Sequence, residues 1–171
     1  MPKLKALFSL PRQLLLKFLS YETEISVFVK DNSELQGAVL ARKVLAQLNL
    51  TPSIRQSEKK HIPSSGRVVI VANYPLASLD AFALIALLND VRSDVKVLSI
   101  DILQTVESLA SILLPTELLS ITNKTMLADS YSRSSAETHL LNGGAVVIFP
   151  AIGISRIEPG GSKDGVWQPY F

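Results

Sequence analysis

Three short apolar runs, separated by segments with helical character, constrain the fold of this chain more than any other feature. They are residues 67–72 (RVVIVA), 95–100 (VKVLSI) and 145–149 (AVVIF). Continuous runs of this length, rich in β-branched residues, are typical of strands buried on both faces of a sheet. Because strands alternating with helices are joined by right-handed crossovers, the pattern predicts an α/β domain with a mainly parallel sheet flanked by helices.

Helices are expected in residues 33–48, 79–89, 103–114 and 125–141. In the first of them, Ser33 and Gln36 have the spacing of a capping box, and an apolar stripe follows. The stripe consists of Leu35, Val39, Leu40, Val44, Leu45 and Leu48. The last helix is expected to stop at Asn142, Gly143 and Gly144, because glycine favours helix ends. The polar residues 49–66, with prolines and a glycine, predict a linking loop.

The first residues of the chain combine apolar and basic side chains. Residues 2–19 (PKLKALFSLPRQLLLKFL) place leucines and phenylalanines at helical spacing beside four cations, with a kink or break at Pro11. Such a segment can lie in a lipid interface, with its cations on anionic headgroups. The alternative is an N-terminal helix packed in the core. We expect residues 1–32 to form a basic amphipathic segment at a membrane surface and residues 33–171 to form the α/β domain.

Charge is distributed unevenly along the chain. Residues 1–67 carry 11 Lys/Arg against 5 Asp/Glu, a balance of +6, and residues 68–171 carry 6 against 10, a balance of −4. A basic front half favours an anionic partner. Because the basic residues lack interleaved aromatics and a recognition-helix pattern, we expect membrane lipids rather than nucleic acid.

Other classes are excluded by composition. The chain has no cysteine, which excludes a disulfide framework, a thiol nucleophile and cysteine-ligated zinc. No apolar run reaches the roughly 18 residues of a spanning helix, and the first residues fit a cleaved signal peptide poorly. We therefore expect a peripheral protein on the cytoplasmic face of a membrane, or otherwise a cytoplasmic one.

The chain ends in an unusual way for an α/β domain. After the third apolar run come several prolines and glycines, and the sequence stops at residue 171. A three-stranded sheet is a small core with two exposed edges. We expect a truncated domain, in which self-association or a protein partner completes the sheet.

Two segments follow strands and are the best candidates for a site, because ligands of open α/β sheets gather beyond the carboxyl ends of the strands. The first is residues 73–80 (NYPLASLD), and the second is residues 149–156 (FPAIGISR). The first contains Asn73, Tyr74 and Asp80. The second contains Phe149, Pro150, Gly153, Ser155 and Arg156.

The stretch VVIVANYPLASLDAFAL resembles the lysophospholipid and glycerol-phosphate acyltransferase (PlsC-like) family. In that family a strand ends in Asn, then His-Pro and a few small residues follow, and an Asp opens a helix. Residues 142–151 (NGGAVVIFPA) are similar to the strand that leads into the Phe-Pro-x-Gly motif of the family. Arg92 and Asp94 look like the lead-in to the intervening strand, and Ser155, Asp164 and Trp167 have counterparts in one bacterial branch. The resemblance spans about residues 40–171.

The resemblance implies acyl transfer from acyl-CoA or acyl-carrier protein to a lysophospholipid-type hydroxyl, with no metal or other cofactor. The histidine of the family is a general base that its aspartate orients; the matching residues here are Tyr74 and Asp80. Imidazole titrates near 6.5 and tyrosine near 10, so the pKa of Tyr74 would have to fall by about 3, which corresponds to about 4 kcal/mol. Asn73, Phe149, Pro150, Gly153, Ser155 and Arg156 are the implied substrate-binding residues.

Departures from the family motif leave a second hypothesis open. Ile152 stands where the motif has its glycine, and a β-branched residue resists the positive φ that glycine accepts. His61 and His139 lack the spacing needed to replace the missing base, and an Asp at a helix start is also an ordinary cap. The alternative is a pseudoenzyme that binds lipid or a protein partner at the membrane surface without catalysis.

Overall fold

The structure, a computed structural model, describes residues 25, 27–73, 78–98, 107–114, 130–151, 156–158, 161–163 and 165–167. Four strands within these ranges form one parallel sheet in the order β1-β4-β2-β3. The strands are β1 (Val68–Val71), β2 (Val95–Leu98), β3 (Leu113–Leu114) and β4 (Ala145–Ile148). The expected α/β class and parallel sheet are confirmed, but the sheet has four strands among the described residues rather than three.

β4 is the best-buried strand because it lies between β1 and β2. All four of its residues are buried. Ala145 is in register with Val68 of β1 on one side and with Val95 of β2 on the other. The three strands therefore begin together at one edge of the sheet, the amino edge, and β1, β2 and β4 end together at the opposite, carboxyl edge.

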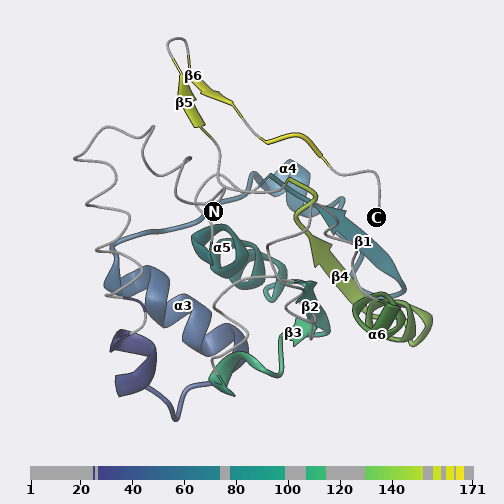
Figure 1. The fold of residues 1–171 in the computed structure, drawn as a ribbon, viewed down its shortest axis with the longest axis horizontal. Helices are drawn as coiled ribbons and strands as arrows, with labels where there is room; N and C mark the ends of the chain where they lie inside the picture. The colour runs from purple at the N-terminus through teal and green to yellow at the C-terminus, as the bar shows by residue number, and fades with distance from the viewer. Residues whose placement is uncertain are drawn as a thin grey trace.

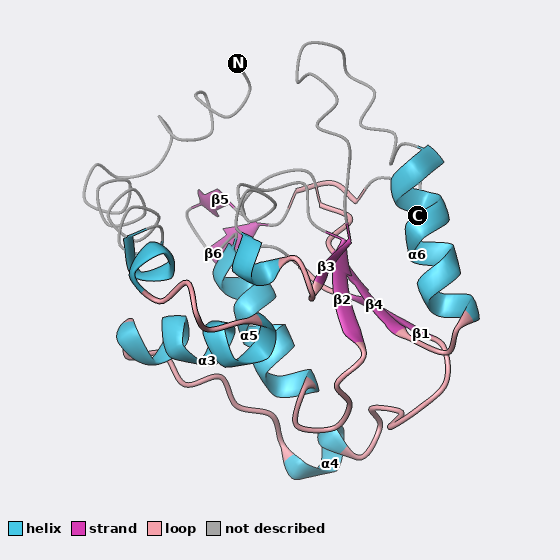
Figure 2. Ribbon diagram, turned by 90° about the horizontal axis from the view of Figure 1, so that it is seen from below, coloured by secondary structure: helices cyan, strands magenta, loops and turns pink. Residues whose placement is uncertain are grey.

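Helices cover both faces of the sheet. Figure 2 shows the sheet between α3 (Gly37–Gln47) and α5 (Ser78–Leu88) on one side and α6 (Ser130–Leu141) on the other. On the first side α3 packs against α5 and α5 against β2; on the second, α6 packs against β4 and β3. The domain is therefore a three-layer α/β/α arrangement.

The main core lies between the sheet and the α3–α5 layer. Its largest fully buried side chains include Phe82, Leu40 and Ile85. Ile25 and Val29 belong to the same cluster, so packing into the core begins before residue 33. Residues 2–19, the expected amphipathic segment, lie outside the described residues.

The first helix begins later than the capping-box pattern predicted. α3 starts at Gly37, and Gln36 is its N-cap with an extended backbone. The residues around Ser33 instead form a turn after a preceding helical segment, in which the amide N–H of Leu35 donates to the carbonyl of Asn32. Val39 is 57% exposed, contrary to its predicted place in the apolar stripe, because it lies on the face of α3 opposite the buried residues Leu40, Ala41 and Val44.

Residues 103–114 do not form the expected helix where the structure describes them. They contain a 3₁₀ turn, η2 (Glu107–Leu109), and the edge strand β3. The amide N–H of Val97 donates to the carbonyl of Ile112 at 2.8 Å, so this apolar run extends the sheet beside β2. Residues 103–106 lie outside the described part.

β1 is not buried on both faces, as its sequence suggested. Its residues alternate between partly buried and exposed, and Val69 and Val71 are 47% and 44% exposed. The reason is its edge position: α6 packs on β4 and β3 and leaves this face of β1 uncovered by the described helices.

The remaining helix ends and connections are mostly as expected. α5 begins one residue before the expected 79–89 segment, and α6 ends at Leu141, where Gly143 takes a φ of +85°. Residues 125–129 lie outside the described part. The expected loop 49–66 contains one helical turn, α4 (Gln56–Lys59).

A hairpin follows β4 where the sequence indicated only a glycine-rich ending. β5 (Arg156–Glu158) and β6 (Gly161–Lys163) pair antiparallel and project away from the main sheet (Figure 1). An isolated antiparallel bridge also joins Ala151 and Trp167.

Candidate functional site at the carboxyl edge

The two segments singled out in the sequence meet at the carboxyl edge of the sheet. Val71, the last residue of β1, is in register with Ile148, the last residue of β4. The pairing continues one step further, because the amide N–H of Ala72 donates to the carbonyl of Ile148 at 3.1 Å. Asn73 and Phe149 therefore leave the sheet from adjacent strands at the same edge.

The side chains at this edge differ in burial. Asn73 is exposed, Phe149 is half-buried against the main core, and Pro150 is buried. The apolar pair Phe149 and Pro150 anchors the chain after β4. Asn73 offers an amide that can both donate and accept a hydrogen bond.

Asp80 lies in the first turn of α5, the helix that follows β1. The first N–H groups of a helix have no partners within it, and the helix dipole favours a negative charge there. Asp80 is half-buried in this position. The carboxylate is thus stabilised at the end of α5 that starts from the carboxyl edge.

Ser78 is the first residue of α5 and is almost fully buried, with 4% exposure. Its hydroxyl oxygen has no hydrogen-bond partner within the described chain. Buried hydroxyl groups without partners are uncommon because leaving one unsatisfied costs about 1–3 kcal/mol. Sequence reasoning did not single out Ser78, whose only signal was its place two residues before Asp80.

Several expected site residues cannot be placed at this edge. Tyr74, Ile152, Gly153, Ser155 and Asp164 lie outside the described residues. For Arg156 the structure describes the backbone, as the first residue of β5, but not the side chain. The structure therefore brings together Asn73, Phe149 and Pro150, and it places Asp80 on the helix that leaves the same edge.

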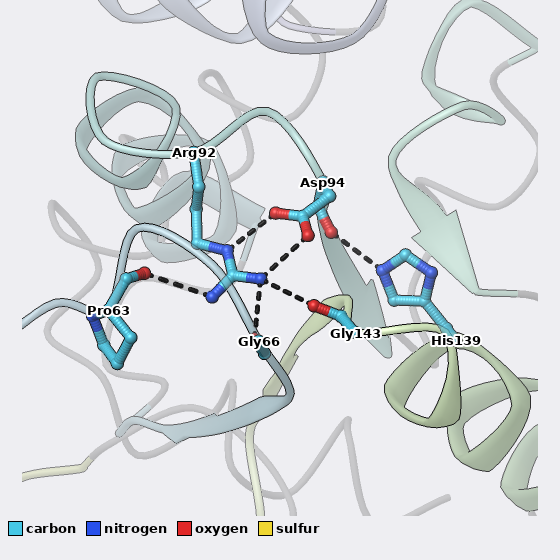
Figure 3. A network of polar contacts seen from close by, with 6 residues as sticks. All are labelled: Pro63, Gly66, Arg92, Asp94, His139 and Gly143. Atoms are coloured by element: carbon cyan, nitrogen blue, oxygen red, sulfur yellow. Dashed lines mark hydrogen bonds and ion pairs between the residues drawn. The ribbon is translucent and has the colours of Figure 1, made fainter.

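The opposite, amino edge is built around Arg92 (Figure 3). Its guanidinium side chain is 1% exposed and forms a two-pronged ion pair with Asp94, with N–O distances of 2.6 and 2.8 Å. It also donates to the backbone carbonyls of Pro63, Gly66 and Gly143 at 3.1, 2.9 and 3.0 Å. The planar fork of arginine suits this set of acceptors.

Charge and hydrogen bonding reinforce each other in this network. The hydrogen bond from Arg92 holds the pKa of the Asp94 carboxyl below its ordinary value, and the same bond raises the pKa of Arg92. Both groups therefore remain charged at neutral pH. From the sequence, Arg92 and Asp94 were expected only to lead into a strand. The available signal for their ion pair was an arginine two residues before an aspartate at the start of that strand.

The two histidines are not at the carboxyl edge. His139, on α6, has its Nε2 atom 2.7 Å from the backbone carbonyl of Asp94, so Nε2 donates to that oxygen at the amino edge (Figure 3). His61 follows α4, and its side chain is 79% exposed beside Glu58. Neither is placed to take a proton from a ligand held between Asn73 and Phe149.

Comparison with known proteins finds no matching family model, no similar curated protein and no similar solved structure. Within the described ranges, no helix combines the length and apolar character that a membrane crossing requires. Function therefore has to be inferred from the residues at the edges of the sheet.

Proposed function

We propose that this protein is a PlsC-like acyltransferase-family protein with its site at the carboxyl edge. The inherited reaction is acyl transfer from acyl-CoA or acyl-carrier protein to a lysophospholipid-type hydroxyl. The observation that carries the proposal is the pairing of β1 with β4, which brings Asn73 next to Phe149 and Pro150. The order of motifs along the chain and their meeting in space support the same assignment.

The chemistry of such a site needs a base, and Asp80 alone does not supply one. It lies in the first turn of α5, and in the family that the motif resembles the aspartate orients the base rather than taking the proton itself. The base position belongs to Tyr74, and a phenol titrating near 10 holds its proton at neutral pH. We therefore propose that the chain binds acyl-transfer substrates but turns them over slowly.

A matched pair of proteins tests this assignment. The parent and its Tyr74→His variant are incubated with labelled acyl-CoA and a lysophospholipid, and the acylated product is measured over time. Because general acid–base catalysis contributes about 10²–10⁴-fold, the variant should exceed the parent by at least about 100-fold. In the Tyr74→His background, Asp80→Asn should remove most of the gain, since the imidazole loses its orienting carboxylate.

Two outcomes contradict the proposal. A parent that is already active and unaffected by Asp80→Asn would place the site elsewhere. A Tyr74→His variant that binds neither acyl-CoA nor lysophospholipid would remove the acyltransferase assignment altogether.

Tyr74 itself favours a second candidate, a pseudoenzyme that binds lipid at this edge. In that case the parent and Tyr74→His bind lysophospholipid with similar affinity by fluorescence titration, and neither gives product. Asp80→Asn then changes the affinity for lysophospholipid, and there is no catalytic rate for it to change.

A further inference from the structure

A shallow groove of about 400 Å³ lies between α6 and the β2–β3 half of the sheet. Lys96 and Leu114 form its floor, and the polar side of α6 forms its wall, including Ser134, Thr138 and His139. It is separate from the carboxyl-edge site, because that site lies where β1 and β4 end.

Lys96 is the unusual residue of the groove. It is the second residue of β2, and its neighbours in the strand, Val95 and Val97, are buried in the main core. Since side chains alternate along a strand, Lys96 faces α6, on the same side as Leu98. A lysine is therefore half-buried on a sheet face where the neighbouring positions are apolar.

The ammonium group of Lys96 has no ion pair or hydrogen bond with any residue that the structure describes. A lysine so placed keeps its aliphatic stem against apolar surface and its ammonium group in the open groove, where no described protein group balances its charge. The described residues lining the groove contain no carboxylate that could compensate it. An anion from outside the chain would provide the missing partner.

The wall of the groove supplies hydrogen-bond donors. Ser134, Thr138 and Asn142 line it, and their side chains make no hydrogen bond to another described residue. Two hydroxyls, an amide and an ammonium give several donors around one space. A tetrahedral oxyanion, with acceptors in several directions, matches this set better than a planar carboxylate does.

The end of α6 weighs against an anion close to Asn142, because the C-terminal end of a helix is partly negative. That effect is reduced here, since the N–H groups of Gly143 and Gly144 bond the last carbonyls of the helix. It also falls off within one turn, so it acts least on an anion held by Lys96 and Ser134; Thr138 lies at the start of the last turn, where only its hydroxyl is required.

We infer that this groove binds a phosphate group through Lys96 and the hydroxyls of Ser134 and Thr138. The groove is open, so the phosphate can belong to a free ion, a small monoester or a lipid headgroup. This site is independent of the carboxyl edge, and its occupancy does not require acyl transfer.

The test uses the full chain with inorganic phosphate as the probe, and sodium chloride at matched ionic strength as the reference. Phosphate should raise the melting temperature more than chloride does, because a ligand that binds the folded state stabilises it. In ¹H–¹⁵N spectra its addition should move the amide signals of Ser134 and Thr138. A short-chain phosphatidate, kept monomeric, then shows whether a lipid headgroup binds more tightly than the free ion.

Lys96→Met should weaken phosphate binding by about tenfold or more, the size of one charge-assisted hydrogen bond. Thr138→Val should weaken it by about threefold, as a neutral hydrogen bond is lost. Lys43→Met, which removes an exposed lysine from α3, is the matched control and should leave binding unchanged. Without phosphate, Lys96→Met should melt at or above the parent temperature, because an unpaired cation is replaced by an apolar side chain.

Three results would overturn the inference. One is a rise in melting temperature with phosphate that is no larger than the rise with chloride, or that is the same in the parent and in Lys96→Met. Another is Lys96→Met melting below the parent without phosphate, which means that Lys96 already has a structural partner. The third is a set of shifts at Asn73 and Ser78 instead, which places the anion at the carboxyl edge and leaves the proposed acyltransferase site intact.

Discussion

Arg92 joins three turns that precede strands of the sheet. It bonds the carbonyl of Gly66 before β1, the carboxylate of Asp94 before β2 and the carbonyl of Gly143 before β4. Its side chain is almost fully buried, whereas the carboxylate of Asp94 is 43% exposed, so the guanidinium group depends on these acceptors for its hydrogen bonds. The amino edge therefore has one side chain at its centre.

Replacing Arg92 by methionine should lower the free energy of unfolding by about 1.5–3 kcal/mol, because the charge-assisted hydrogen bonds to the half-exposed carboxylate of Asp94 are lost together with those to three backbone carbonyls. Urea denaturation followed by circular dichroism measures the loss. Arg42→Met is the control: its ion pair with Asp90, at 2.7 Å, is exposed on both sides, so the cost should stay within about 1 kcal/mol. Equal losses for the two variants would contradict the central role of Arg92.

Gly144 allows the ring of His139 to lie against the backbone before β4. A Cβ atom added at Gly144 would come within 3.0 Å of three atoms of that ring, a separation that real Cβ atoms do not show. Gly144→Ala should therefore displace His139 from the carbonyl of Asp94 and cost about 1–3 kcal/mol of stability.

The double variant Gly144→Ala/His139→Ala separates this clash from other effects. Once the ring is removed, Gly144→Ala should cost much less, so the two substitutions are not additive in urea denaturation. Additive losses would show that Gly144 is required for a reason unrelated to His139.

At the scale of elements, the apolar runs predicted β1, β2 and β4 within one or two residues. Burial was predicted less well, because a run such as VVIV looks the same in a central and in an edge strand. What distinguishes β1 is that α6 reaches only as far as β4, and this depends on tertiary packing. The sequence of one strand does not contain that information.

The elements that were predicted wrongly also depend on tertiary contacts that the local sequence does not show. Residues 113–114 are apolar, and a short apolar run fits a buried helix or a strand equally well; the open edge of β2 decides for a strand. Ser33 and Gln36 have capping-box spacing, but residues 32–34 form a turn that is closed by the hydrogen bond from Leu35 to Asn32. Ser33 is therefore not at the start of a helix. Gly37 then begins α3 with a φ of +56°, with Ser111 and Ile112 close to where a Cβ would lie.

The difference between edge and centre gives a direct prediction for two valines. Val69→Thr in β1 should change stability by no more than about 0.5 kcal/mol, because this side chain is 47% exposed. Val147→Thr in β4 should cost about 1–3 kcal/mol, because the same hydroxyl is placed in a fully buried site. Thermal and urea unfolding of the two proteins compare them, and a reversed order would mean that β1 is covered in solution.

At the scale of the molecule, the sheet separates two groups of polar residues. The carboxyl edge has Asn73 and the helix that carries Asp80, and the groove under α6 has Lys96 and a row of hydroxyls. The first was predictable because strand ends can be located from the sequence. The second was not, because Lys96 and Ser134 come together only when α6 folds back over β2.

The basic residues near the N-terminus lead to a prediction about the whole protein at a membrane. Ile25 is the first described residue of the main core, so removing residues 1–20 deletes no residue of the described core. If those residues bind the lipid interface, the full chain should float with vesicles containing anionic lipid and the shortened chain should not. Each Lys or Arg near an anionic surface contributes about 1 kcal/mol.

A variant with altered charge tests the same prediction without deleting any residue. Replacing Lys3, Lys5, Arg12 and Lys17 by glutamine keeps the leucines of the segment but removes its four cations. Binding to anionic vesicles should fall by at least about tenfold, while the weaker binding to neutral phosphatidylcholine vesicles stays the same. Raising the salt concentration should reduce binding of the parent and leave the glutamine variant unaffected, because only the charge contribution is screened. Equal flotation of the parent, the shortened chain and the glutamine variant would exclude this segment as the membrane contact.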